Sequence, residues 1–268
     1  MSGGLSFRIL GCGSSPGVPR MGGDWGACDP ANPRNRRRRA SLLITRRDAA
    51  TGAATRVLVD TGPDMREQIL DAGIGWVDGV VYTHPHADHI HGIDDLRSFV
   101  INRKRMVDVY ADAPTLARLK EGFGYCFATP AGSSYPPILR AHTIEPGEVV
   151  TIDGPGGPID LMPFQQVHGD ILSLGFRIGD VAYSPDVSAL DERATPYLDG
   201  LAVWILDALR YTPHPSHFSV AEAVAWIERQ KPKRAILTHM HVDLDYAALR
   251  ASLPEGAEPA YDGLEFEC

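Results

Sequence analysis

The stretch Thr83-His84-Pro85-His86-Ala87-Asp88-His89 decides which fold this chain adopts. It follows the apolar residues Val80-Val81-Tyr82, so it lies where a strand is expected to end. Pro85 excludes a regular helix at that point, because proline has no N–H and holds the residue before it in extended geometry. The chain can turn into a helix only after this point, and the first turn of that helix then carries Asp88 and His89.

Four side chains of the types that bind metal ions therefore converge within six residues: His84, His86, Asp88 and His89. The two that flank the proline point to the same side of an extended chain. Imidazole suits zinc, iron, nickel and copper, and a carboxylate extends the range to manganese. Two ions about 3.5–4 Å apart can hold a bridging hydroxide and stabilise both the attacking and the leaving oxygen. A plain polar turn at a helix cap is the alternative, and four ligand types at this spacing argue against it.

The composition is that of an ordinary globular protein. Of the 268 residues, 44% are apolar and 22% are charged, and the net charge of −8 gives no general attraction to nucleic acid or anionic membranes. No run of about 18 apolar residues predicts a membrane span. The first residues lack the pattern of a signal peptide, so we expect a cytoplasmic protein. The wide spacing of the cysteines predicts free thiols rather than a disulfide framework or a zinc knuckle: Cys12, Cys28, Cys126 and Cys268.

Short β-rich runs and helical patterns follow one another without a clear linker, so we expect a single domain over residues 1–268. The predicted strands are 6–10, 42–45, 57–60, 79–83, 107–111, 149–152, 159–164, 174–178, 181–184, 202–206 and 235–238. Helical patterns cover 65–72, 90–102, 115–123, 220–230 and 246–253. Many strands with interspersed helices indicate a mixed α/β fold, in which sheets pack together and helices lie outside.

The start of the helix at 220–230 is well defined by the sequence. Ser219 and Glu222 form a capping box, in which each side chain bonds to the backbone N–H of the other residue. The apolar runs before and after this helix predict two parallel strands whose ends lie at one edge of a sheet. Asp207 and His239 follow these strands, and that edge is where open α/β sheets place their sites.

The motif at residues 84–89, H-x-H-x-D-H after a strand, resembles the signature of the metallo-β-lactamase superfamily. Further motifs of that superfamily follow in the expected order: Asp60 in Leu58-Val59-Asp60-Thr61-Gly62, His168 in Gln166-Val167-His168-Gly169, Asp186 in Tyr183-Ser184-Pro185-Asp186, and His239 in Leu237-Thr238-His239. The resemblance covers most of the chain. It implies an αββα sandwich of two mixed β-sheets flanked by helices, with metal ions at the edge of the two sheets.

The same resemblance implies two divalent ions per chain, and zinc and manganese both fit. It assigns their ligands as follows: His84, His86 and His168 to one ion, Asp88, His89 and His239 to the second, and Asp186 as a bridge between them. Asp60 would orient a ligand through a hydrogen bond, and we expect similar support from Asp207. The motif also recurs as Thr238-His239-x-His241-x-Asp243, by chance or because the fold has two similar halves. If the repeat is real, His241 is a remnant of the duplicated motif or a residue that orients a ligand, rather than a ligand itself.

The stretch Pro213-His214-Pro215-Ser216-His217-Phe218-Ser219 resembles the phosphodiesterase branch, which includes the tRNA 3′-processing endonuclease and phosphoribosyl cyclic phosphodiesterases. In that branch a histidine here faces the metals across the scissile phosphate. With a pKa near neutrality, His217 could protonate a leaving oxygen or steady a phosphoryl oxygen, unless it is merely a surface-loop histidine. The glycine-rich turn at 11–17 also resembles the cyclic phosphodiesterases and lets backbone N–H groups approach an anion. Ser14, Ser15 and His214 are therefore candidate substrate contacts.

Arg34 and Arg36–Arg39 form a basic run, which is either a solvated loop or a contact for a substrate phosphate. Some relatives carry a cysteine cluster nearby for a structural zinc, whereas this chain has only Cys28 in that stretch. No long basic insertion resembles the RNA-gripping arm of the tRNA-processing relatives. We therefore expect a small substrate, no stable nucleic-acid partner and no membrane association, and a homodimer stays open.

The sequence thus predicts a metal-dependent phosphodiesterase for a small cyclic phosphate or nucleotide-like phosphodiester. A hydroxide between two ions would attack phosphorus, with Asp88 orienting it and His217 assisting the leaving oxygen. Three alternatives remain: a thioester or lactam hydrolase, an iron-based oxidoreductase, and a non-catalytic nucleotide-binding protein. The region of His217 argues against the first. The iron-based oxidoreductases of this superfamily usually have a carboxylate in place of His86 and an added flavin domain, and neither is seen in this sequence.

Overall fold

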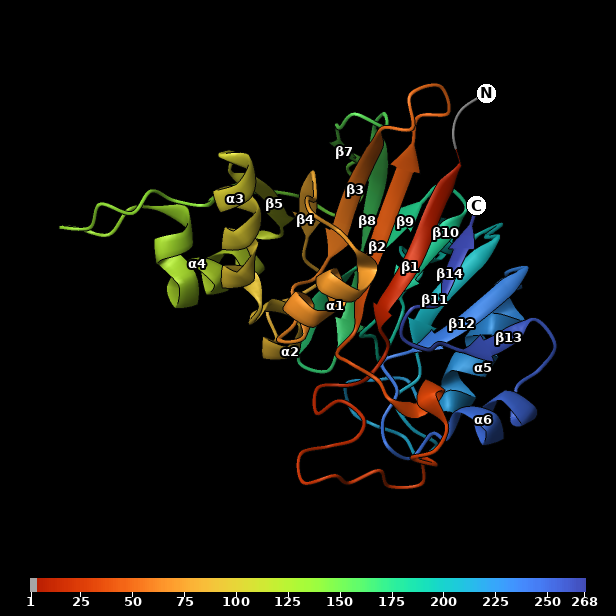
Figure 1. The fold of residues 1–268 in the computed structure, drawn as a ribbon. Helices are drawn as coiled ribbons and strands as arrows, with labels where there is room; N and C mark the ends of the chain where they lie inside the picture. The colour runs from red at the N-terminus through yellow and green to blue at the C-terminus, as the bar shows by residue number, and fades with distance from the viewer. Residues whose placement is uncertain (1–3) are drawn as a thin grey trace.

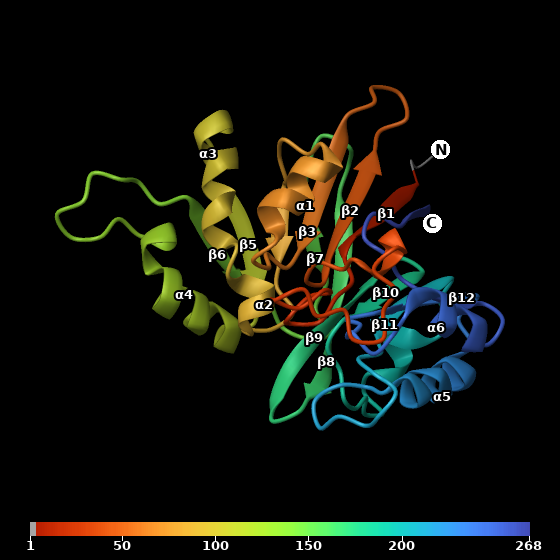
Figure 2. The ribbon, with the colours of Figure 1, turned by 60° about the horizontal axis from the view of Figure 1, so that its bottom comes forward.

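The computed structural model describes residues 4–268 and contains two seven-stranded sheets that pack face to face, with helices outside (Figure 1, Figure 2). The strand order is β14-β1-β2-β3-β4-β5-β6 in the first sheet and β13-β12-β11-β10-β9-β8-β7 in the second. Both sheets mix parallel and antiparallel pairs. The predicted αββα sandwich of two mixed sheets is confirmed.

The strands of the first sheet are β1 (Leu5–Gly11), β2 (Ser41–Arg47), β3 (Ala54–Val59), β4 (Gly79–Val81), β5 (Val107–Ala111), β6 (Leu139–Thr143) and β14 (Glu265–Glu267). Those of the second are β7 (Val150–Ile152), β8 (Ile159–His168), β9 (Ile171–Ile178), β10 (Val181–Ser184), β11 (Val203–Asp207), β12 (Arg234–Thr238) and β13 (Ala257–Pro259). Each predicted run overlaps one of these strands. The sequence reading missed β6, β13 and β14, which all lie at sheet edges and bury few side chains.

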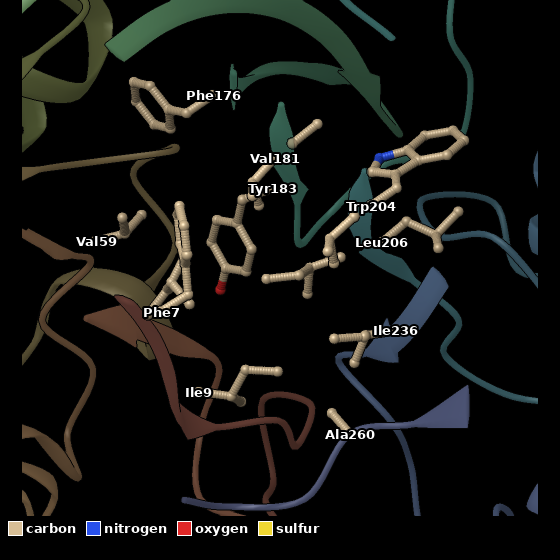
Figure 3. Close-up of a cluster of buried hydrophobic side chains, with 14 of the residues drawn as sticks. Phe7, Ile9, Val59, Phe176, Val181, Tyr183, Trp204, Leu206, Ile236 and Ala260 are labelled. Atoms are coloured by element: carbon tan, nitrogen blue, oxygen red, sulfur yellow. The ribbon is translucent and has the colours of Figure 1, made fainter. Parts of the chain in front are cut away.

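Apolar side chains from both sheets fill the space between them. Figure 3 shows Phe7, Ile9 and Val59 of the first sheet facing side chains of the second, among them Phe176 and Tyr183. All five side chains are buried to 1% exposure or less. Burial of each large apolar side chain contributes about 1.5–3 kcal/mol, so this shared cluster holds the two sheets together.

The helices are α1 (Met65–Ala72), α2 (Ala87–Ile90), α3 (Arg97–Arg103), α4 (Ala113–Phe127), α5 (Val220–Gln230) and α6 (Tyr246–Ser252), with 3₁₀ turns at Pro33–Asn35, Ile93–Leu96 and Thr195–Leu198. Figure 1 shows α1 to α4 beside the first sheet and α5 and α6 beside the second. None of the helices in residues 4–268 combines the length and apolarity that a membrane crossing needs.

The prediction of one continuous helix over residues 90–102 is wrong. The chain leaves the helical path at Gly92, whose N–H donates to the Thr61 carbonyl over 2.7 Å. A Cβ at Gly92 would lie 2.2 Å from the Gly62 carbonyl oxygen, so only glycine permits this approach. The break packs the short helix α2 against the turn that follows β3.

Parallel strand pairs bring the candidate site residues to one edge of the sandwich. β3 and β4 are parallel, as are β11 and β12, in which Asp207 lies opposite Thr238. The predicted parallel arrangement around α5 is therefore confirmed. Asp60 and His239 follow β3 and β12 with left-handed φ values of 63° and 57°. Such a conformation costs about 1–3 kcal/mol at a residue with a side chain, so the contacts of these two residues must offset it.

The predicted capping box of α5 is present, since Ser219 Oγ accepts from the Glu222 N–H and the Glu222 carboxylate accepts from the Ser219 N–H. We expect Ser219→Ala to lower the free energy of unfolding by about 1 kcal/mol, because it leaves a backbone donor of the first turn unpaired. Thermal denaturation should show a drop of about 2–4 °C. Glu228→Ala, an exposed substitution in the same helix, is the control and should leave the melting temperature in place.

Candidate metal centre

Three histidines from both sheets point their ring nitrogens at one another. His86 Nδ1 lies 3.0 Å from His84 Nε2 and 3.1 Å from His168 Nε2. Hydrogen bonds fix the other nitrogen of two of these rings. His84 Nδ1 lies 2.9 Å from the Thr83 hydroxyl, and His168 Nδ1 donates to the Ser216 carbonyl over 2.6 Å. The nitrogens that face one another are therefore the ones left free to bind an ion.

A second set consists of Asp88, His89 and His239. Asp88 Oδ2 lies 3.5 Å from the Nε2 atoms of both histidines. Asp60 orients this set, because its carboxylate accepts from His89 Nδ1 over 2.7 Å and from the N–H and hydroxyl of Thr83 over 2.8 Å. The left-handed backbone of Asp60 is thus compensated by three hydrogen bonds, and His89 Nε2 is turned toward the other two ligands.

Asp186 lies between the two sets. Its Oδ1 is 3.2 Å from His89 Nε2, and its Oδ2 is 3.3 Å from His239 Nε2. The same Oδ2 lies 3.8 Å from the Nε2 atoms of His84 and His168. The structure thus brings all seven sequence-predicted ligands together, in the two groups expected, with one carboxylate between them.

The chemistry of these atoms fits divalent cations. His89 Nε2, His239 Nε2 and Asp186 Oδ1 are buried without a hydrogen-bond partner in the described chain, which is costly unless an ion occupies the space between them. Burial lowers the pKa of His84 well below its usual range and that of His168 to about 4, so both rings are neutral and offer lone pairs. Lone pairs 3.0–3.1 Å apart repel each other unless they share a cation.

His217 lies at the margin of the centre and is only 8% exposed, so the surface-loop interpretation is wrong. Its Nδ1 donates to Asp207 Oδ2 over 2.7 Å, and Asp207 also accepts from the Val187 N–H over 3.0 Å. Its ring stacks on that of His239, with centroids 4.7 Å apart. Asp207 therefore positions His217 so that Nε2 remains available. His214 is partly exposed, and its ring lies 5.3 Å from that of His217.

The serines of the glycine-rich turn differ from each other. Ser15 Oγ donates to Asp88 Oδ2 over 2.7 Å, so this serine bonds a predicted metal ligand. Ser14 is 2% exposed, and its hydroxyl has no partner in the described chain. Contact of either serine, or of His214, with a substrate stays a prediction.

The bond from Ser15 should tune ion binding at the Asp88 set. We expect Ser15→Ala to weaken binding of an ion at the Asp88 set about tenfold, because groups that orient a ligand typically change affinity by about 10–100-fold. Competition with a chromogenic chelator measures this directly. Ser98→Ala, at an exposed serine of α3, is the matched control. Equal affinities in both variants would show that Ser15 does not orient Asp88.

The solvated-loop interpretation of the basic run is wrong for Arg37, Arg38 and Arg39. Arg37 is 1% exposed and donates to the carbonyls of His241 and Leu244 over 3.2 and 2.6 Å. Arg38 pairs with Asp71 and Asp262, Arg39 pairs with Asp64, and Arg34 lies over the rings of Tyr246 and Tyr261. Of this run, Arg34 and Arg36 are exposed. Four of these side chains tie the segment to neighbouring parts of the chain: Arg34, Arg37, Arg38 and Arg39.

His241 lies outside both candidate ligand sets. Its Nδ1 donates to Asp243 Oδ2 over 2.9 Å, and Arg20 contacts the other ring nitrogen. Nearby, Cys28 is buried and its thiol lies 3.3 Å from the Val242 carbonyl. The sequence reading missed Arg20, and no motif marks it.

Comparison with known proteins agrees with this geometry. A family model described as the beta-lactamase superfamily domain matches residues 55–240, so the chain belongs to this superfamily of metal-dependent hydrolases. The predicted family is therefore confirmed. The fold of this family implies divalent metal ions, for which the histidine and aspartate clusters provide the ligands.

Several individual proteins are similar to almost the whole of this chain. A crystal structure described as a new diphosphatase from the PhnP family has 35% identity and a TM-score of 0.88, over 100% of this chain and 98% of that one. The short form of human tRNase Z shares the fold, at 15% identity and a TM-score of 0.64, over 97% and 98% of the two chains. An octanoyltransferase of Porphyromonas gingivalis is 33% identical over 264 residues, which are 96% of this chain and 50% of that protein. The chain thus spans about half the length of this curated relative.

Proposed function

We propose that the protein is a binuclear metal-dependent phosphodiesterase that hydrolyses a small phosphodiester. One observation carries the proposal: two ligand sets share Asp186, and His217 is held beside them by Asp207. The 35% identity to a protein described as a diphosphatase supports phosphorus chemistry over thioester or lactam hydrolysis. A cyclic phosphate or nucleotide-like phosphodiester is the substrate class, without a stable nucleic-acid partner.

Divalent ions bound to the two sets, zinc or manganese, would activate water and neutralise charge on the phosphoryl oxygens. The chain itself supplies orientation and proton transfer. Asp88 accepts a hydrogen bond from Ser15 that fixes its carboxylate, and this carboxylate would orient the attacking water. With Nδ1 of His217 bound to Asp207, Nε2 is the nitrogen that faces a substrate. When the ring is doubly protonated, Nε2 also carries a proton, which would pass to the leaving oxygen of the phosphodiester and leave neutral His217 with Nδ1–H still bound to Asp207.

The experiment that tests this function uses metal-stripped protein and bis-p-nitrophenyl phosphate, titrated separately with manganese and with zinc. We expect turnover to return with metal and to saturate near two ions per chain, and the ion that restores the higher rate is the preferred one. Two bound ions without turnover would instead favour the thioester hydrolase or the nucleotide-binding protein.

His217→Ala should lower kcat for the same substrate about a hundredfold while both ions stay bound. General acid catalysis typically contributes about 10²–10⁴-fold, and p-nitrophenolate, a good leaving group, needs less of it. Because His217 is not among the predicted ligands, metal analysis of the variant separates loss of the proton donor from loss of the centre. Wild-type kcat in His217→Ala would exclude the role. His142→Ala, a partly exposed histidine on β6, serves as the control.

A further inference from the structure

An apolar cavity of about 490 Å³ lies between α3 and the segment 135–138, and it shares no residue with the metal centre. Its walls include Val100 and Ile101 of α3, Met106, and the sequence Tyr135-Pro136-Pro137. Figures 1 and 2 show that the loop between α4 and β6, which includes this sequence, extends away from the sheets beyond α4. The volume falls within the range of about 300–1,000 Å³ that is typical of small-molecule sites.

A second cavity of about 270 Å³ adjoins the first, because Arg97, Tyr135 and Pro136 line both. The two cavities therefore adjoin each other at Tyr135, and together they are called the crevice below. Its side chain is 74% exposed and that of Ile101 is 57% exposed, although both are large and apolar. A ligand that covered them would remove apolar surface from water, which is favourable.

The wall formed by the loop is held in place before any ligand arrives. The Thr129 hydroxyl donates to the Tyr135 carbonyl over 3.0 Å, and the Ile138 N–H donates to the Cys126 carbonyl over 2.8 Å. The two consecutive prolines have fixed φ angles and no N–H groups that require partners. A ligand therefore meets a wall that is already ordered, which lowers the entropy cost of binding.

The rim of the crevice is positively charged in a chain whose net charge is −8. Arg97 is paired with Asp94 over 2.6 Å. The Arg105 guanidinium lies 5.5 Å from the centre of the Trp76 ring. Within residues 4–268, no carboxylate lies within ion-pairing distance of Lys104 or Arg105. Two cations beside the apolar walls thus lack an anionic partner.

We propose that this crevice binds an amphipathic anion, a small molecule with an apolar body and one acidic head group. The body packs against Ile101 and the two prolines, and the head group lies at Lys104 and Arg105. A second copy of the chain fits less well, because a two-fold contact through this crevice would bring the same cations toward one another. The proposal is independent of the phosphodiesterase function.

Two fluorescent probes that differ in one charge test this site on the metal-loaded full chain. 8-Anilinonaphthalene-1-sulfonate has an apolar body and an anionic head, and N-phenyl-1-naphthylamine lacks the sulfonate. We expect one sulfonated molecule per chain, bound at least threefold more tightly than the uncharged probe. Ile101→Asn should weaken both probes about tenfold. Lys104→Gln should weaken only the sulfonated probe, by about three- to fivefold, as expected for an exposed ion pair.

Val149→Asn is the matched control, because Val149 is 56% exposed and lies outside the crevice. The proposal would be overturned if the two probes bound with equal affinity. It would also be overturned if neither Ile101→Asn nor Lys104→Gln changed the affinity of either probe. Sedimentation at several protein concentrations adds a further check. A dimer that Ile101→Asn dissociates would assign the crevice to a second copy and would also overturn it.

Discussion

Asp186→Ala should lower kcat/KM for bis-p-nitrophenyl phosphate by about a thousandfold or more. The carboxylate lies 3.2 Å from His89 Nε2 and 3.3 Å from His239 Nε2, and it also faces the three-histidine set, so its loss would remove a ligand from each of the two proposed ions. Metal ions provide several kcal/mol of transition-state stabilisation. Each ~1.36 kcal/mol that is lost corresponds to a tenfold lower rate.

Metal analysis of the same sample should show fewer than two ions per chain. Asp186→Asn keeps the shape of the side chain but makes it a neutral ligand, so it should fall between wild type and alanine in metal content. Asp199→Ala removes an exposed carboxylate outside the centre and controls for net charge. If the Asp186→Ala variant kept two ions and full activity, Asp186 would not be a ligand shared between them.

The largest effect on stability is expected at Arg37. Its guanidinium donates to the carbonyls of His241 and Leu244 and to Asn35 Oδ1, all in a site with 1% exposure. Arg37→Ala leaves these acceptors buried and unpaired, and hydrogen bonds to a charged group contribute about 1.5–3 kcal/mol each. We expect the free energy of unfolding to fall by about 3–5 kcal/mol, which corresponds to a melting temperature roughly 10 °C lower.

Differential scanning calorimetry of the metal-saturated protein checks this value. Arg36→Ala is the matched control, since Arg36 is the exposed neighbour in the same run. Arg37→Lys keeps the charge but cannot reach both carbonyls, and it should lose about half as much stability as alanine. If Arg37→Ala had the same melting temperature as Arg36→Ala, the buried arginine would contribute nothing to the stability of the fold.

The sequence predicted well which side chains the fold brings together at the candidate metal centre, because their signal is local. Four of them lie within six residues, and the others each follow an apolar strand in an order that a known superfamily shares. The break at Gly92 was not predictable from helical periodicity, because it depends on the close approach of the Gly62 backbone. The edge strands β13 and β14 have three residues each, too few to show an alternation of buried and exposed side chains.

Contacts between distant segments explain what the sequence reading missed at the site. Ser15 bonds Asp88 across 73 positions of sequence, and Arg37 bonds the His241 carbonyl across 204. The resemblance to cyclic phosphodiesterases suggests the serines of the glycine-rich turn as substrate contacts, and the arginine run is open to two interpretations, a solvated loop or a phosphate contact. Neither inference takes account of the fold, which places one beside a ligand and buries the other.

Each ligand set draws on both sheets. His84 and His86 follow β4 of the first sheet, whereas His168 ends β8 of the second, and Asp88 and His89 likewise meet His239 from beyond β12. An ion bound to either set is therefore a cross-link between the two layers of the sandwich. By mass action, one such ion at a hundred times its dissociation constant adds about 2.7 kcal/mol to the free energy of unfolding. The free energy of unfolding of this protein will therefore depend on the metal content of the buffer. A buffer that chelates metal ions should lower it without any change in the chain.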